Sequence, residues 1–231
     1  MTQVDVTRIG IVVPAHDEQE LLPHCLASLR RAAAPLRGAG MRIDIVVVLD
    51  ACTDGSAELA ARAGVTIVPV AVRNVGAARA AGFDAVLTGS GEDLWLATTD
   101  ADSTVPRHWL ATQLGAFRAG WDVFVGTVRV VDWAAHPPGT CARYLRRYQF
   151  RDGHPHVHGA NLGFSAHSYR RVGGIPALPT GEDVALVTAL QAAGCTVLRS
   201  HLAPVTTSAR PHGRAPDGFA TYLGSLMAAP I

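Results

Sequence analysis

The chain has 231 residues, which suits one domain, and 48% of them are hydrophobic, enough to fill a large core. The net charge of +1 and the charged fraction of 17% argue against a nucleic-acid partner and against a polybasic membrane patch. All 20 basic residues are arginine, so the absence of lysine excludes a P-loop lysine, a Schiff-base lysine and a pyridoxal phosphate enzyme.

The first half of the chain alternates short β-branched runs with longer stretches of helical periodicity. Pro14 is expected to end the first strand, and Gly64 to close the second helix. The predicted elements, in chain order, are strand 8–13, helix 18–36, strand 44–50, helix 53–64, strand 65–72, helix 75–89, strand 93–100 and helix 107–120.

The second half departs from this regular alternation. Its predicted elements are a long strand over 121–133, an arginine-rich helix over 140–153, a strand over 155–166, a helix over 179–194, a strand over 195–207 and a Pro/Gly/Arg-rich tail over 208–223. Together the two halves predict one α/β domain with a mixed, mainly parallel sheet covered by helices on both faces. Ligands of such sheets bind at the carboxyl ends of the strands.

The cysteines and the N-terminus carry no targeting or structural-metal signal. Cys25, Cys52, Cys141 and Cys195 lie far apart without a C-x-x-C pair, which argues against a structural zinc site. The N-terminus lacks a basic stretch followed by a long apolar run, so we expect neither a signal peptide nor an anchor. No apolar run approaches the length that spans a bilayer. We therefore expect a cytoplasmic, reduced protein.

Two aspartates stand one residue apart where the fourth predicted strand ends, in the segment "TTDADS". Residues i and i+2 of an extended chain face the same side, so Asp100 and Asp102 could hold Mg²⁺ or Mn²⁺ and leave positions open for phosphate oxygens. The alternative is that Asp102 or Ser103 caps the helix that follows. The spacing alone leaves both interpretations open.

The other strand ends are also polar. Asp50 closes the second predicted strand, where a carboxylate can accept hydrogen bonds from a base or a ribose, whereas Asp54 is better explained as a helix cap. Arg79, in the third helix, offers a guanidinium suited to carboxylate or phosphate, although a solvated arginine is the simpler explanation.

Six segments together resemble the family 2 glycosyltransferases of GT-A fold, and the likeness runs from Ile9 to about Ala193. The segments are "VVPAHDE", "VVLDACTDGS", "NVGAARAAG", "TTDADS", "GANLGFSAHSYRRVGGIP" and "GEDVALVTAL". The resemblance implies a single GT-A domain over 1–231, with a nucleotide-sugar half over 1–105 and an acceptor half over 106–231. It also implies inverting transfer from a nucleotide sugar, assisted by Mn²⁺ or Mg²⁺.

The resemblance assigns roles to particular positions. Asp50 would bind the base, and Arg79 would lie near the base or the diphosphate. Asp102 would hold the metal, and Asp100 would touch the ribose or the metal. The implied nucleotide-sugar site comprises Pro14, Ala15, His16, Glu18, Asp50, Arg79, Asp100 and Ala101, and the implied catalytic residues are Asp183, as the base, and Glu182.

The predicted position of Asp183 also supports its role as a general base, independently of the family resemblance. Thr180 is a plausible N-cap for the helix over 179–194, which puts Asp183 in the first turn, where the helix dipole favours an anion. An ionised carboxylate is what a general base requires. The alternative is that this acid serves only as a capping residue.

The acceptor side is expected to include His158 and Asn161, with Arg210 and Arg214 of the tail facing an anionic acceptor or the diphosphate. His212 or His201 is a candidate for a further metal ligand. A rival interpretation puts zinc on His154, His156 and His158, which share one side of an extended chain, but Pro155 interrupts that strand and no carboxylate accompanies them.

The sequence also departs from the family pattern. His16 stands where tyrosine is frequent, Leu49 replaces a frequent aspartate, and Ala80 replaces the usual asparagine. The Q-x-x-R-W motif of processive synthases is missing, so a cellulose- or chitin-synthase role is not expected.

The predicted function is transfer of a sugar from a UDP- or GDP-linked donor to an unknown acceptor hydroxyl. The alternatives are a retaining transferase of similar fold, a nucleotidyltransferase and an inactive sugar-nucleotide-binding protein. An NAD-dependent oxidoreductase is disfavoured because no G-x-G-x-x-G follows the first strand. We expect no nucleic-acid partner and no integral membrane segment, leave a homodimer open, and expect peripheral membrane association if the acceptor is a lipid carrier.

Overall fold

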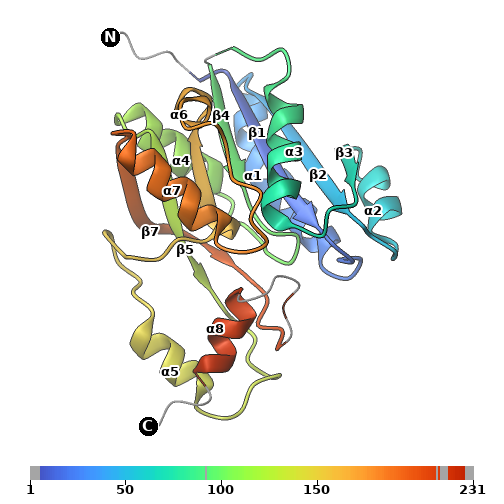
Figure 1. The fold of residues 1–231 in the computed structure, drawn as a ribbon, viewed down its shortest axis with the longest axis vertical. Coiled ribbons are helices and arrows are strands. Elements are labelled where there is room, and N and C mark those ends of the chain that lie inside the picture. Colours follow the sequence, from blue (N-terminus) through green and yellow to red (C-terminus); the bar gives the residue numbers. More distant parts are fainter. Residues whose placement is uncertain (1–5, 92, 212, 214–217, 227–231) are drawn as a thin grey trace.

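The computed structural model describes residues 6–91, 93–211, 213 and 218–226 (Figure 1). A seven-stranded sheet in the order β3-β2-β1-β4-β6-β5-β7 forms its centre. Its strands are β1 Arg8–Ala15, β2 Arg42–Asp50, β3 Thr66–Val70, β4 Leu94–Thr98, β5 Val123–Arg129, β6 Leu162–Ser165 and β7 Val197–Thr206. Only β6 runs antiparallel to its neighbours, β4 and β5. The prediction of a mixed, mainly parallel sheet is therefore confirmed.

Helices cover both faces of the sheet (Figure 1). They are α1 Leu22–Gly38, α2 Ser56–Arg62, α3 Val75–Leu87, α4 Trp109–Arg118, α5 Thr140–Arg147, α6 Ala166–Arg171, α7 Glu182–Ala192 and α8 Phe219–Ser225, with a 3-10 turn η1 over Gly159–Asn161. The sheet has a hydrophobic core on each face, and successive residues of a strand point into opposite cores. Ile11 and Val13 of β1 pack toward α1 and α4, and Val12 packs toward α3.

Close packing of α3 on the sheet depends on glycine. A Cβ on Gly82 of α3 would overlap the side chains of Val12 and Val48 on β1 and β2. The small residue lets the helix backbone approach the sheet, and this brings the N-terminus of α3 to the edge where β1 and β2 end. The alanine- and glycine-rich sequence of this helix therefore positions the site.

The predicted boundaries fail mainly in the second half. Residues 155–158 are irregular and β6 begins only at Leu162, because Pro155 lacks an N–H group for a strand ladder. The arginine-rich helix ends at Arg147, and α8 arises in a segment that was predicted as tail. In the first half, β1 continues through Pro14 to Ala15.

Helices α5 and α8 lie apart from the sheet, beyond the end of β5 (Figure 1). The rings of Tyr144 on α5 and Phe219 on α8 meet edge to face with centroids 6.3 Å apart. Tyr144 also contacts Trp133 and stacks on Tyr148. An aromatic cluster thus joins two segments that are far apart in sequence.

No helix within the described part of the chain is long and apolar enough to cross a membrane.

Candidate active site

A pocket of about 570 Å³ lies at the carboxyl ends of β1, β2 and β4. Pro14 and Ala15 end β1, Asp50 ends β2 and Asp100 follows β4, and all four residues line the pocket. Parallel neighbours bring their carboxyl ends to one edge, so strand ends distant in sequence meet there. The pocket lies where the sheet topology predicts a site.

Asp50 organises one end of the pocket through its carboxylate. Oδ1 accepts hydrogen bonds from the N–H groups of Val72 and Arg73, both at 2.8 Å, and Oδ2 accepts one from the N–H of Asn74 at 2.9 Å. Its backbone carbonyl oxygen lies 2.6 Å from Nδ1 of His16. Asp50 therefore holds the loop before α3, a structural task that the sequence did not reveal, and its contact with a base stays a prediction.

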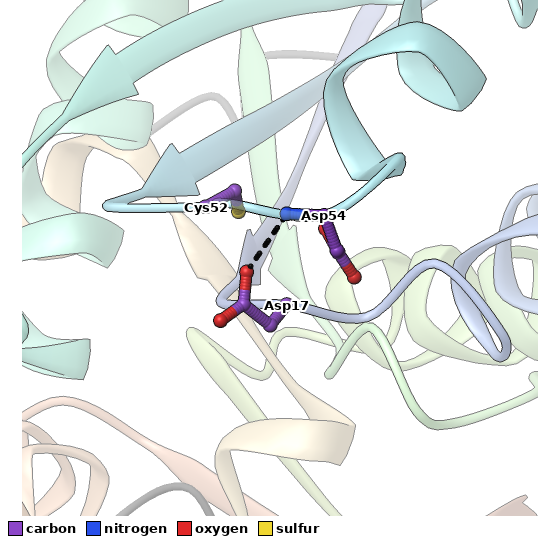
Figure 2. A group of neighbouring side chains, drawn as sticks. All are labelled: Asp17, Cys52 and Asp54. Atoms are coloured by element: carbon purple, nitrogen blue, oxygen red, sulfur yellow. Dashed lines mark hydrogen bonds between the residues drawn. The ribbon is translucent and has the colours of Figure 1, made fainter.

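Asp17, Cys52 and Asp54 also cluster where β1 and β2 end (Figure 2). Asp17 Oδ1 accepts N–H groups from Thr53 at 2.7 Å and from Asp54 at 3.3 Å. The Asp54 carboxylate accepts N–H groups of Gln19 and Ser56, at 2.9 and 3.0 Å. These oxygens tie two loops together, so we interpret the cluster as interlocking turns rather than as a metal site.

Arg79 forms the floor of the pocket. Its side chain is only 3% exposed, and its guanidinium forms ion pairs with Asp100 and Glu182. The Nε–H group lies 3.3 Å from Oγ1 of Thr98. A Cβ on Gly159 would collide with the guanidinium, so glycine is needed where this backbone passes. Arg79 thus links α3, β4 and α7, and it is not the solvated residue of the simpler explanation.

Glu182 also lines the pocket, but its side chain is 5% exposed and paired with Arg79. Its predicted catalytic role stays a prediction. The ion pair gives it a positioning role as well, because a buried guanidinium needs a compensating charge.

Asp100 faces the pocket. Its side chain is 38% exposed, and the residue pairs with Arg79 through one oxygen. Desolvation by the surrounding protein raises the pKa of Asp100; Arg79 opposes this shift, whereas the charges of Asp102 and Asp183 add to it. Its other oxygen has no hydrogen-bond partner within the described residues and remains available to a ligand.

Asp102 pairs with a residue that was expected on the acceptor side. Nη2 of Arg210 lies 2.5 Å from Asp102 Oδ2 and 2.6 Å from Glu18 Oε1. Burial disfavours the charge on Arg210, but the two carboxylates outweigh it and raise the pKa of the guanidinium. Arg210 therefore lies with Glu18 and Asp102, which were predicted on the donor side, because the chain after β7 turns back over the end of β4.

Neither Asp102 nor Ser103 caps the next helix. The N-cap of α4 is His108, and no side chain bonds to the helix end there. The capping alternative for these two residues is therefore wrong.

Asp183 lies in the first turn of α7 and lines the pocket. Its Oδ2 accepts the N–H of Gly159 at 2.6 Å, and its Oδ1 accepts the N–H of Val184 at 2.7 Å. The helix begins after Gly181, whose φ is +73°, so Thr180 is not the N-cap that the sequence suggested. The left-handed glycine turns the chain so that Asp183 reaches the pocket.

Aromatic side chains line the opposite end, where Tyr148, Phe219 and Tyr222 meet. Nε2 of His158 lies 2.9 Å from the Tyr148 hydroxyl. Burial lowers the pKa of His158 to about 3, and His156 and His154 reinforce the shift, so this imidazole is neutral at physiological pH. Sequence reasoning missed the three aromatic residues because two lie in the segment predicted as tail.

The zinc interpretation of the three histidines finds no support in the described residues. The rings of His154 and His156, and those of His156 and His158, stack with centroids 5.8 and 6.0 Å apart instead of converging on a point. Nε2 of His156 accepts the N–H of Gln149 at 2.9 Å. His201 pairs with Asp152 at 2.9 Å.

Asn161 is corrected from acceptor residue to structural anchor. Its amide donates to the carbonyl oxygens of Thr127 and Ala203 at 2.8 and 2.9 Å, and its oxygen accepts the indole N–H of Trp109. The residue is completely buried. His212 and Arg214 lie outside the described residues.

The chain belongs to glycosyl transferase family 2, whose sequence profile matches residues 10–172. It is 35% identical over 136 residues to the undecaprenyl-phosphate 4-deoxy-4-formamido-L-arabinose transferase of Pseudomonas paraeruginosa, across 56% of this chain and 38% of that protein. The protein of the same name from Salmonella paratyphi A is 34% identical over 131 residues, across 54% of this chain and 37% of its own length. The chain thus matches well under half the length of these relatives.

Solved structures of low sequence identity share the fold. The mannosyltransferase PcManGT from Pyrobaculum calidifontis, in complex with GDP-Man and Mn²⁺, superposes with a TM-score of 0.65 at 20% identity, across 90% of this chain and 58% of that one. TarS 1-349 of S. aureus in complex with UDP gives 0.60 at 12% identity, across 96% of this chain and 70% of its own. The GT-A fold that the sequence predicted is confirmed.

Proposed function

We propose that the protein transfers a sugar from a nucleoside-diphosphate sugar to an acceptor hydroxyl, with inversion at the anomeric carbon. The observation that carries the proposal is a single pocket lined by the carboxylates of Asp100, Asp102 and Asp183. Membership in glycosyl transferase family 2 supports the reaction class. Both predicted halves, 1–105 and 106–231, contribute residues to this pocket, which is consistent with donor and acceptor meeting there.

The donor is proposed to lie along the ends of β1 and β2. Pro14, Ala15 and His16 offer backbone and a ring for the base, beside the loop that Asp50 holds. UDP and GDP are the first candidates, because structures of this fold are named with UDP and with GDP-Man. The diphosphate would lie toward Asp100 and Asp102, near the guanidinium of Arg210.

Asp183 is the proposed base. Its carboxylate takes the proton of the acceptor hydroxyl while the acceptor oxygen bonds to the anomeric carbon. The bond from that carbon to the diphosphate oxygen breaks, and the nucleoside diphosphate leaves with the electron pair. A single displacement from the opposite face inverts the configuration. The hydrogen bond from Gly159 fixes the orientation of the carboxylate before the acceptor arrives.

Asp100 and Asp102 are the residues proposed to hold a divalent cation. They fit it chemically: Asp100 keeps one oxygen without a partner among the described residues, and Asp102 already carries a positive group, the Arg210 guanidinium. When bound, Mn²⁺ or Mg²⁺ would offset the charge of the departing diphosphate. His212, the candidate third ligand, stays a prediction.

The names of the curated relatives suggest a second acceptor class, a polyprenyl phosphate. A phosphate oxygen is already ionised near neutral pH and would need no base. A cytoplasmic enzyme bound at the membrane surface would suit such an acceptor. Substitution of Asp183 separates the two cases, because only a hydroxyl acceptor depends on proton removal.

A ligand screen tests the proposal. Thermal unfolding is measured with UDP, GDP, dTDP and CDP, each with and without Mn²⁺. We expect one nucleotide to raise the midpoint only when the metal is present, and the matching nucleotide sugar to be slowly hydrolysed. An absence of any response, or stabilisation by NAD alone, would overturn the proposal.

A further inference from the structure

The segment from residue 129 to residue 151, here called the basic lobe, has a charge unlike the rest of the chain. It carries five arginines and one aspartate, Asp132, although the net charge of the whole protein is only +1. The arginines are Arg129, Arg143, Arg146, Arg147 and Arg151. The overall composition therefore concealed a local concentration of positive charge.

Apolar side chains are exposed in the same lobe. Val131 is 67% exposed, Leu145 57% and Phe150 38%. Phe150 belongs to an aromatic cluster, since its ring and that of Trp133 both contact Tyr144, at 6.1 and 5.3 Å between centroids. Leu145 directly follows Tyr144 in the sequence, and Val131 lies two residues before Trp133. Exposed apolar groups among arginines form a surface suited to a partner with both anionic and apolar parts.

Helix α5 has two distinct sides. Thr140 and Tyr144 are buried inside the lobe, whereas Leu145, Arg146 and Arg147 are exposed. Within the described residues, neither Arg146 nor Arg147 forms a hydrogen bond or ion pair with a carboxylate, and both side chains are exposed. Long arginine side chains can reach headgroups while a neighbouring leucine enters the acyl boundary.

The lobe also borders the pocket. Tyr148, directly after α5, lines the aromatic end, and Phe219 of α8 contacts Tyr144 of α5 while lining the same pocket. A ligand held in a bilayer against this lobe would therefore lie beside the proposed acceptor end. That orientation rests on the proposed function, whereas the charge and exposure of the lobe do not.

We propose that the basic lobe docks the protein onto an anionic membrane surface, with the exposed side of α5 in the headgroup layer. An acidic protein would match the arginines but would not by itself explain three exposed apolar side chains among them. A lipid surface matches both, because phosphate groups meet the guanidinium groups and the interface accepts leucine and phenylalanine. Membrane docking at this lobe needs no membrane-spanning helix.

Vesicle sedimentation of the full chain tests the proposal, without donor or metal. Vesicles of phosphatidylcholine alone are compared with vesicles containing one-third phosphatidylglycerol. We expect binding to the anionic vesicles only, weakened by salt. The double variant Arg146→Ala/Arg147→Ala should reduce the partition about 25-fold, since each arginine near an anionic surface contributes about fivefold. Leu145→Ser should weaken vesicle binding at both low and high salt, because salt does not screen the apolar contribution of leucine.

Arg31→Ala/Arg118→Ala is the matched control, because it removes two exposed arginines from α1 and α4. This control should bind like the parent protein, and all variants should unfold at the same temperature. Equal binding to both kinds of vesicle, or equal losses in the two double variants, would overturn the proposal. The proposal would also be overturned if the protein bound an acidic protein but did not bind the anionic vesicles. A protein that docks but responds to no nucleotide would refute the proposed function and leave the docking intact.

Discussion

The two ends of the pocket differ in their residue types and in the elements that carry them. At the proposed donor end, carboxylates on strand ends are held by backbone N–H groups and arginines, as Asp50 is by residues 72–74 and Asp102 by Arg210. At the proposed acceptor end, Tyr148, Phe219 and Tyr222 come from segments outside the sheet. The difference suggests that donor chemistry is tied to the fold, whereas the acceptor end can change without disturbing the sheet.

The largest expected effect is on chemistry, where the two ends meet. Asp183→Asn keeps an oxygen for the N–H of Gly159 but cannot accept a proton. Donor hydrolysis should fall by roughly 10²–10⁴-fold, while nucleotide affinity measured by titration stays within about twofold. If transfer to a polyprenyl phosphate proceeds at the parent rate in this variant, the hydroxyl-acceptor mechanism is wrong.

The next effect is on stability and concerns the donor end. Arg79→Met removes the cation between Asp100 and Glu182 and leaves Glu182 buried without a partner. We expect a loss of about 3–5 kcal/mol in the free energy of unfolding, measured in urea. Arg79→Met combined with Glu182→Gln should recover part of that loss. A loss below about 1 kcal/mol in the single variant would mean that the ion pairs do not hold this end together.

A smaller effect tests the cation site. Arg210→Gln removes the guanidinium that would compete with a metal for Asp102. Mn²⁺ affinity without nucleotide, measured by electron paramagnetic resonance, should rise about five- to tenfold. Arg118→Gln, an exposed change on α4, is the charge-matched control. Unchanged Mn²⁺ affinity would contradict a shared site.

The last effect concerns the proposed acceptor end and is spread over several pH units, so it is the smallest at any single pH step near neutrality. Since the pKa of His158 is lowered to about 3 in the folded protein, the unfolded chain binds one more proton between that value and the ordinary pKa of 6.5. The stability that the neutral ring contributes is complete above the ordinary pKa and is lost as the pH falls toward 3. His158→Phe should flatten the stability profile below pH 6.5, by at most about 1.4 kcal/mol per pH unit. Parallel profiles would show that burial of this imidazole is unimportant.

The sequence by itself determined the mixed, mainly parallel sheet, most of its helices and the grouping of the carboxylates at the strand ends. Apolar runs of the right length predict buried strands, and parallel order brings their ends together, so Asp50, Asp100 and Asp102 could be grouped without coordinates. The family pattern extended this grouping to Asp183. These features depend on local periodicity and on one topological rule.

Only the tertiary structure decided which charges pair and what forms the acceptor end. Arg210 lies 108 residues from Asp102 in sequence, and Glu182 lies 103 residues from Arg79, so no local sequence pattern predicts either ion pair. The sequence predicts Asn161 as a substrate ligand, but in the structure its side chain bonds to β5, β7 and α4. Long-range partners depend on how loops fold back over the sheet, and sequence periodicity carries no signal for that.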